Sequence, residues 1–75
     1  MLQSTIDVSY AALRVWAANL RDAHDNKTIR DLATTLISTM DSYDVVKRWN
    51  PMIAEEIWKS CRMLESLIHK LLKEL

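Results

Sequence analysis

The sequence predicts an all-α fold, an antiparallel bundle of three main helices that is completed by oligomerisation. None of the 75 residues is glycine and only one is proline, whereas tight β-hairpin turns depend on glycine and on Asn-Gly pairs. Apolar residues recur at intervals of three and four along most of the chain, which is the period of one helix face. Short polar segments separate these periodic stretches, so successive helices should reverse direction and pack side by side.

The first helix is expected to begin near Ser4. Its hydroxyl can cap free backbone N–H groups, and Asp7 stands three residues later, at the spacing of a capping box. The helix should end in the polar segment 22–27, where Asp25 or Asn26 can cap the helix that follows. Its apolar face consists of Ile6, Tyr10, Leu13, Ala17 and Leu20.

The second helix carries an apolar arc that changes side near its end. At about 100° per residue, one arc contains Ile29, Leu32, Ala33, Leu36, Ile37 and Met40. Tyr43 still fits this arc, but the next apolar residues fall on the opposite side: Val45, Val46 and Trp49. Asp41 and Asp44 have the spacing of a cap and its third residue. The helix therefore either breaks near residue 41 or runs straight and presents a second apolar face.

The third helix is expected to run from Pro51 almost to Leu75. Asn50 is a good cap, proline favours the first helical turn, and the residue before a proline is disfavoured in a helix. A heptad seam runs along it, typical of a bundle or coiled coil: Ile57, Cys61, Leu64, Ile68, Leu71 and Leu75. Trp58 is expected to lie beside this seam among polar residues. If the end of the helix projects, its leucines require a partner chain.

Length and composition predict one domain, residues 1–75, with a narrow margin of stability. A chain this short buries only about 60% of its unfolded surface, and its single cysteine excludes an intramolecular disulfide. Hydrophobic residues nevertheless make up 49% of the chain. Because small domains without disulfides or metals often rely on a partner, we expect self-association as a homodimer.

Charge and hydropathy bear on location and on binding partners. Ten basic residues balance ten acidic ones, so the chain has no global field that would attract nucleic acid or an anionic membrane. The longest uncharged stretch, Leu32 to Met40, is too short to span a bilayer, and no basic segment followed by an apolar run marks a secretion signal. We expect a cytoplasmic protein that does not bind membranes and keeps its cysteine reduced.

Arg62, Glu65 and His69 share one face of the third predicted helix. Arginine, six residues and then histidine is similar to the loose spacing of the ribonuclease motif of HEPN domains, although Met63 stands where those domains usually carry a polar residue. Surface ion pairs at helical spacing explain the same face without any catalysis. A HEPN-like ribonuclease, or the partner of one, is therefore kept as an alternative function, and no residue is assigned a catalytic role.

No metal site and no cofactor are expected. Glu65 with His69, or His24 with neighbouring aspartates, supplies too few ligands, and bundle metal sites need several carboxylates and histidines projecting inward. Here the inward stripes are apolar. Cys61 lies on such a stripe, where a cysteine behaves mainly as a small hydrophobic residue.

A small DNA-binding regulator is a second alternative. Arg21, Lys27 and Arg30 surround the first corner, as in a helix-turn-helix. Three carboxylates interleaved with them cancel most of the local charge: Asp22, Asp25 and Asp31. Binding to DNA relies on several phosphate contacts from basic groups, so nucleic acid is an unlikely partner.

The leading hypothesis is a small non-enzymatic interaction protein, a regulator or inhibitor that binds a protein partner or itself through an apolar helix surface. The predicted partner interface comprises Val45, Val46, Trp49, Met52 and Trp58. Tryptophan and methionine are enriched at protein interfaces, and tryptophan at their energetic centres. The competing interpretation is a kink that turns these residues back into the core as a cap.

Overall fold

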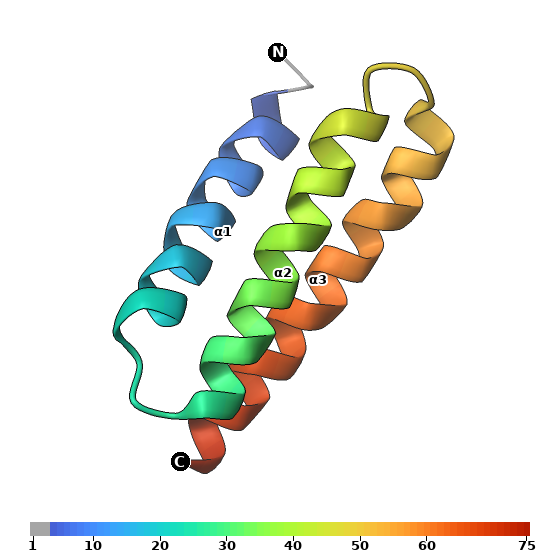
Figure 1. The fold of residues 1–75 in the computed structure, drawn as a ribbon. Helices are drawn as coiled ribbons and strands as arrows, with labels where there is room; N and C mark the ends of the chain where they lie inside the picture. Colours follow the sequence, from blue (N-terminus) through green and yellow to red (C-terminus); the bar gives the residue numbers. More distant parts are fainter. Residues whose placement is uncertain (1–3) are drawn as a thin grey trace.

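The computed structural model describes the backbone of residues 4–75 and the side chains of residues 9–75. It contains three helices, α1 (Ser4–Ala23), α2 (Lys27–Val46) and α3 (Pro51–Glu74) (Figure 1). Residues 4–75 contain no strand. The all-α prediction is therefore confirmed. Helix α1 is described from Ser4 onward, and the residues before it lie outside the described part of the chain. The predicted capping contact between Ser4 and Asp7 lies outside the described side chains.

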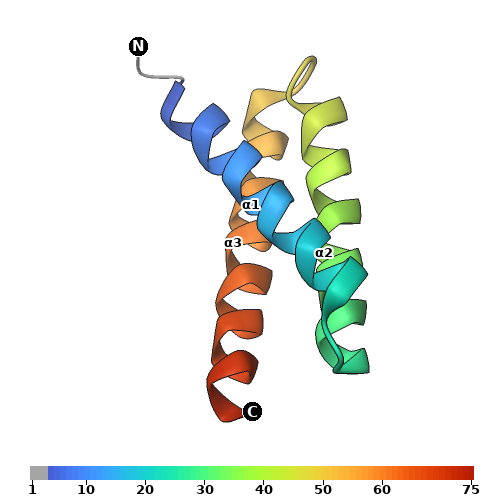
Figure 2. The same ribbon diagram turned by 90° about the vertical axis from the view of Figure 1, so that its left-hand side faces the viewer.

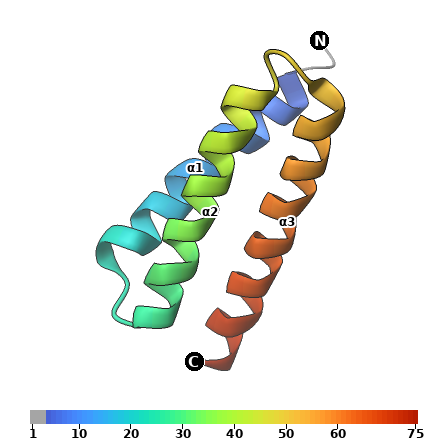
Figure 3. The same cartoon turned by 45° about the vertical axis from the view of Figure 1, so that its right-hand side comes forward.

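The chain reverses direction at both corners, and α2 packs against both of its neighbours (Figure 1). Figure 3 shows α3 lying along α2, with the C-terminus at the same end of the molecule as the α1–α2 corner. Helix α1 crosses the other two obliquely (Figure 2) and has a much smaller contact with α3 than with α2. The molecule is accordingly elongated, with extents of 38 × 21 × 19 Å.

Both corners use an asparagine to start the next helix. The Asn26 side-chain oxygen accepts a hydrogen bond from the Ile29 N–H at 3.1 Å, and the Asn50 oxygen accepts one from the Ile53 N–H at 3.2 Å. Pro51 occupies the first turn of α3, as the sequence predicts. Among the described residues none has a positive φ angle, so neither corner requires the conformational freedom of glycine.

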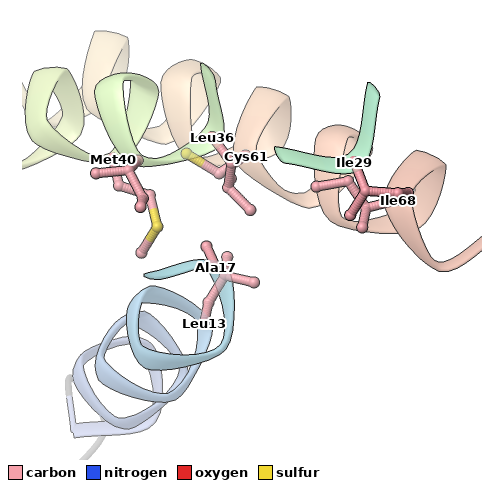
Figure 4. Packing of buried hydrophobic residues seen from close by; sticks show 8 residues of the cluster. Leu13, Ala17, Ile29, Leu36, Met40, Cys61 and Ile68 are labelled. Carbon is pink, nitrogen blue, oxygen red and sulfur yellow. The ribbon is translucent and has the colours of Figure 1, made fainter. Parts of the chain in front are cut away.

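The hydrophobic core is formed where the apolar faces of all three helices meet. Leu13 and Ala17 of α1 face buried residues of α2 and α3 across the core (Figure 4). The remaining members of the core cluster come from α2 and α3: Ile29, Leu36, Ile37, Met40, Cys61 and Ile68. The first two predicted helix faces are thus buried or half-buried wherever side chains are described.

The break near residue 41, one of the two alternatives, is absent. Helix α2 continues without interruption through Asp41 to Val46. Asp41 therefore caps no restarted helix, and its carboxylate pairs with the Arg14 guanidinium of α1 at 2.7 Å. Of the three residues assigned to a second apolar face of α2, Val45 is exposed, Val46 is half-buried and Trp49 lies in the turn beyond the helix.

The predicted seam of α3 is buried at its centre and open at its end. Cys61 and Ile68 are fully buried, whereas the side chain of Leu75 is 71% exposed. Ala54, three residues before Ile57, is also buried, although the predicted seam did not include it. Near the C-terminus, Leu71 and Leu72 pack against the core cluster. The seam therefore lies slightly nearer the N-terminal end of α3 than the heptad pattern indicates.

Candidate functional site

Large exposed apolar side chains gather at the corner between α2 and α3. Among the described residues, eight large hydrophobic side chains are exposed, and four of them lie between positions 45 and 53. Val45 is 58% exposed, Trp49 70%, Met52 83% and Ile53 51%. We call these four residues the corner surface; the corner itself is the loop that joins α2 to α3 in Figure 1. Scattered exposed hydrophobic residues are ordinary, but a local concentration marks a candidate binding site.

The corner is held in a defined conformation. The N–H groups of Trp49 and Asn50 both donate to the Val46 carbonyl, at 3.1 and 2.8 Å, so the chain continues for a further turn beyond α2. The Asn50 cap then starts α3 directly. Ile53 was missed in the sequence prediction, although it stands four residues after Trp49, a spacing that could have indicated it. Val46, in contrast, is half-buried.

Trp58 does not lie on the open surface with the other predicted interface residues. Its ring is 5.4 Å from Tyr43 and 6.3 Å from Tyr10, and the two tyrosine rings are 5.9 Å apart. These three rings, one from each helix, form an aromatic cluster. The expectation that Trp58 would lie among polar residues is therefore wrong, whereas the structure does bring Val45, Trp49 and Met52 to one corner.

Polar groups fix the aromatic cluster in place. The Lys47 ammonium lies 5.8 Å from the centre of the Tyr10 ring and 5.7 Å from that of Tyr43, within the range of cation–π attraction. The Tyr10 hydroxyl donates to the Met40 carbonyl at 3.2 Å and accepts from Arg14. Burial raises the pKa of Tyr10, and the hydrogen bond to Asp41 raises that of Arg14. The tyrosine therefore stays neutral and the arginine stays charged around pH 7.

A second candidate is the groove between α1 and α3 that contains the predicted charged face. The Arg62 Nε atom is 3.3 Å from one Glu65 oxygen, and the His69 Nε2 atom is 3.8 Å from the other. The His69 ring also stacks on Trp16, with the ring centres 4.6 Å apart. Glu65 thus contacts both Arg62 and His69, the two residues whose spacing is similar to the ribonuclease motif. Their arrangement is that of two surface side chains around one carboxylate, with the histidine ring against an aromatic ring.

Cys61 is fully buried at the centre of the core (Figure 4). Burial raises the pKa of its thiol to about 11, so the reactive thiolate is scarce near neutral pH. Within the described part of the chain, no group of three or more histidine, cysteine or carboxylate side chains could hold a metal ion. The described residues thus offer no centre for thiolate or metal chemistry.

The basic residues are dispersed and largely matched by carboxylates. Six of the ten form an ion pair with a neighbouring aspartate or glutamate: Arg14, Arg21, Lys27, Lys47, Lys59 and Arg62. Arg30 instead donates to the carbonyls of His24 and Asp25, at 2.9 and 2.8 Å, and so closes the first corner. A continuous basic stripe is the usual footprint of a DNA-binding surface, and this arrangement does not favour one.

Comparison with known protein families, curated proteins and solved structures found no match to the chain. Among the residues that the structure describes, no helix is both long enough and apolar enough to cross a membrane.

Proposed function

We propose that this chain is a small non-enzymatic interaction protein, a regulator or inhibitor that binds another protein through the corner surface. The observation that supports this most directly is the exposure of Val45, Trp49, Met52 and Ile53 within one corner of the fold. Full burial of such a side chain is worth about 1.5–3 kcal/mol. An exposed tryptophan surrounded by other apolar side chains is the typical composition of a binding hot spot.

The rigidity of the corner supports the same proposal. Binding loses affinity when loops and side chains must be ordered on association. Here the turn is fixed by hydrogen bonds to the Val46 carbonyl and by the Asn50 cap. The apolar side chains are thus presented on a preorganised support, so less of the binding free energy is lost to ordering.

The remaining side-chain chemistry is consistent with a protein that binds rather than catalyses. The Cys61 thiol is protonated and buried, while Arg62 and His69 are engaged with Glu65. We place the protein in the cytoplasm, where its single thiol stays reduced, and we include self-association as a homodimer in the proposal.

The test is recovery of partners from a lysate of the source organism with the tagged wild type and a Val45→Ser, Trp49→Ser double variant. The matched control is Val15→Ser, because Val15 is an equally exposed valine on α1, 62% exposed. We expect a partner that the wild type and the control retain and that the double variant loses by at least about tenfold, the effect of truncating one hot-spot residue.

Binding of that partner should then be measured with purified components, with circular dichroism confirming that all three proteins are folded. Equal retention of every recovered protein by the wild type and the double variant would contradict the proposed role of the corner surface.

A further inference from the structure

Helix α3 carries a second heptad seam on the flank that faces away from α1. Its members follow steps of four and three residues, the spacing of helices that pair along their length. We call the following set the flank seam: Ile53, Ile57, Ser60, Leu64, Leu67 and Leu71. Ile53 is 51% exposed and Leu67 43%, and Met63 beside them is 73% exposed. Ser60 is also exposed, whereas the three residues that this seam shares with the predicted one, Ile57, Leu64 and Leu71, are half-buried, and Leu64 and Leu71 pack against the core cluster. The core of the molecule therefore leaves the outer edge of this seam uncovered.

The side chains of α2 beside the flank seam are small and uncharged. A groove between α2 and α3 is lined by Ile57 and Ser60 of the seam and by five hydroxyl residues of α2: Thr34, Thr35, Ser38, Thr39 and Ser42. Four of the five hydroxyls donate to the carbonyl four residues earlier. Their hydrogen bonds are thus satisfied within the helix, and side chains this small let another helix approach closely.

The charged residues next to the flank seam can form opposite-charge pairs with those of a second copy of α3 that is related by a two-fold rotation. Glu56, Met63 and Lys70 follow one another at intervals of seven residues, each directly before a seam residue, and all three are exposed. When two copies of α3 pair in antiparallel orientation, the residues at positions 56, 63 and 70 of one copy face the same set of residues in the other copy. Met63 then meets Met63 of the partner subunit, and Glu56 meets Lys70 of the partner subunit on both sides of the axis.

A parallel pair lacks this complementarity. In parallel coiled coils, the positions that precede the seam face those that directly follow it. In α3 the residues directly after seam positions 53, 60 and 67 are Ala54, Cys61 and Ile68, all of which are buried in the core of their own chain. Glu56 and Lys70 would then have no facing charge, so the pattern selects the antiparallel orientation.

We propose that the flank seam binds a second copy of the chain, with the two α3 helices antiparallel and the two-fold axis near Met63. This inference deepens the homodimer part of the proposed function. The flank seam shares Ile53 with the corner surface but includes neither Trp49 nor Val45. Leu64 packs against Ser60 of the partner subunit, and Leu67 against Ile57 of the partner subunit. The seam from Ile53 to Leu71 is about 27 Å long at 1.5 Å per residue, and the same patch serves both copies, as two-fold symmetry requires.

A charge-swap experiment on the full chain tests this arrangement. Sedimentation analysis should give the wild type twice the 8.7 kDa of one chain. Glu56→Lys alone places lysine against lysine, and Lys70→Glu alone places glutamate against glutamate, so each variant should associate at least about tenfold more weakly. An equimolar mixture of the two variants restores opposite charges at both contacts and should recover the dimer, as should the double swap.

Two apolar variants separate this surface from the corner surface. Leu67→Ser should dissociate the dimer while the chain keeps its helical circular dichroism, because Leu67 is partly exposed. Trp49→Ser should leave the dimer intact. A wild type that stays at 8.7 kDa up to about 100 μM, a mixture no stronger than its components, or dissociation by Trp49→Ser but not by Leu67→Ser would overturn the inference. A monomeric wild type would also remove the homodimer part of the proposed function. Binding of another protein through Val45 and Trp49 is tested by the recovery experiment, so that part of the proposed function fails or stands separately.

Discussion

Two tryptophans of the same predicted interface give a sharp test, because the structure places them in different environments. Trp58 is half-buried, with its ring against Tyr10 and Tyr43, whereas Trp49 is 70% exposed at the corner. Replacing each by alanine removes the same side chain from a different setting. We expect Trp58→Ala to destabilise the fold strongly and Trp49→Ala to change stability by less than about 0.5 kcal/mol, as is usual for an exposed site.

The magnitude for Trp58 follows from its burial and its ring contacts. A tryptophan buries roughly 150–250 Å², so half-burial at about 25 cal/mol per Å² is worth about 2–3 kcal/mol. Two aromatic pairs add about 0.5–1.5 kcal/mol each beyond the buried area. The total of about 3–6 kcal/mol overlaps the usual cost of about 3–5 kcal/mol for replacing a core tryptophan by alanine.

The assay is thermal unfolding followed by far-ultraviolet circular dichroism, since tryptophan fluorescence changes with the substitution itself. In a domain of this size 1 kcal/mol corresponds to about 4–8 °C, so the midpoint of Trp58→Ala should fall by at least about 12 °C. Similar midpoints for the two variants would show that the aromatic cluster does not contribute to stability as reasoned. A fall for Trp49→Ala alone would show that the corner is part of the core.

Three further outcomes are expected. Ile68→Ala should lower the free energy of unfolding by about 2–5 kcal/mol, because Ile68 is fully buried, whereas exposed Val15→Ala should leave it almost unchanged in the same urea titrations. The Cys61 thiol, whose pKa burial raises to about 11, should react with iodoacetamide at pH 8 far more slowly than glutathione does and become fast in denaturant; rapid labelling of the native chain would contradict its burial. Arg62→Ala and His69→Ala should leave partner binding and folding essentially intact, and an RNA-cleaving activity lost in both folded variants would overturn the non-enzymatic assignment.

The helices were predictable from the sequence because local signals specify them. Asn26 and Asn50 cap α2 and α3 as predicted, and Pro51 starts α3. The apolar periodicity also identified the buried faces, since burial of one stripe per helix is what holds a small bundle together. The possible break near Asp41 was left open because the cap spacing of Asp41 and Asp44 permits one. In the structure the Asp41 carboxylate pairs with Arg14 of another helix, 27 residues earlier, a contact that spacing along one helix cannot reveal.

The candidate site was predictable only in part, for the same reason. Val45 was identified by its angular position on α2, which depends on the helix alone, and Trp49 by extending the same helix into what the structure shows to be the turn beyond it. Trp58 was misplaced because its surroundings depend on how α1 crosses the bundle and brings Tyr10 to Tyr43. On α3 the predicted seam contains Ile57, Leu64 and Leu71 of the flank but not Ile53 or Leu67, since one amphipathic helix can carry two adjoining apolar seams and only tertiary packing decides which of them is covered.

The small contact between α1 and α3 has a consequence for how the chain is made. Because α2 packs against both neighbours, most of the close backbone packing joins helices that are consecutive in the sequence. Folds with such local contacts form in microseconds to milliseconds, whereas a ribosome adds about 5–20 residues per second. Folding is therefore fast compared with synthesis, so each helix can pack on the preceding one as soon as both are outside the ribosome. The apolar face of the α1–α2 hairpin stays exposed until α3 has also emerged, and the chain is most vulnerable to misassociation during that interval.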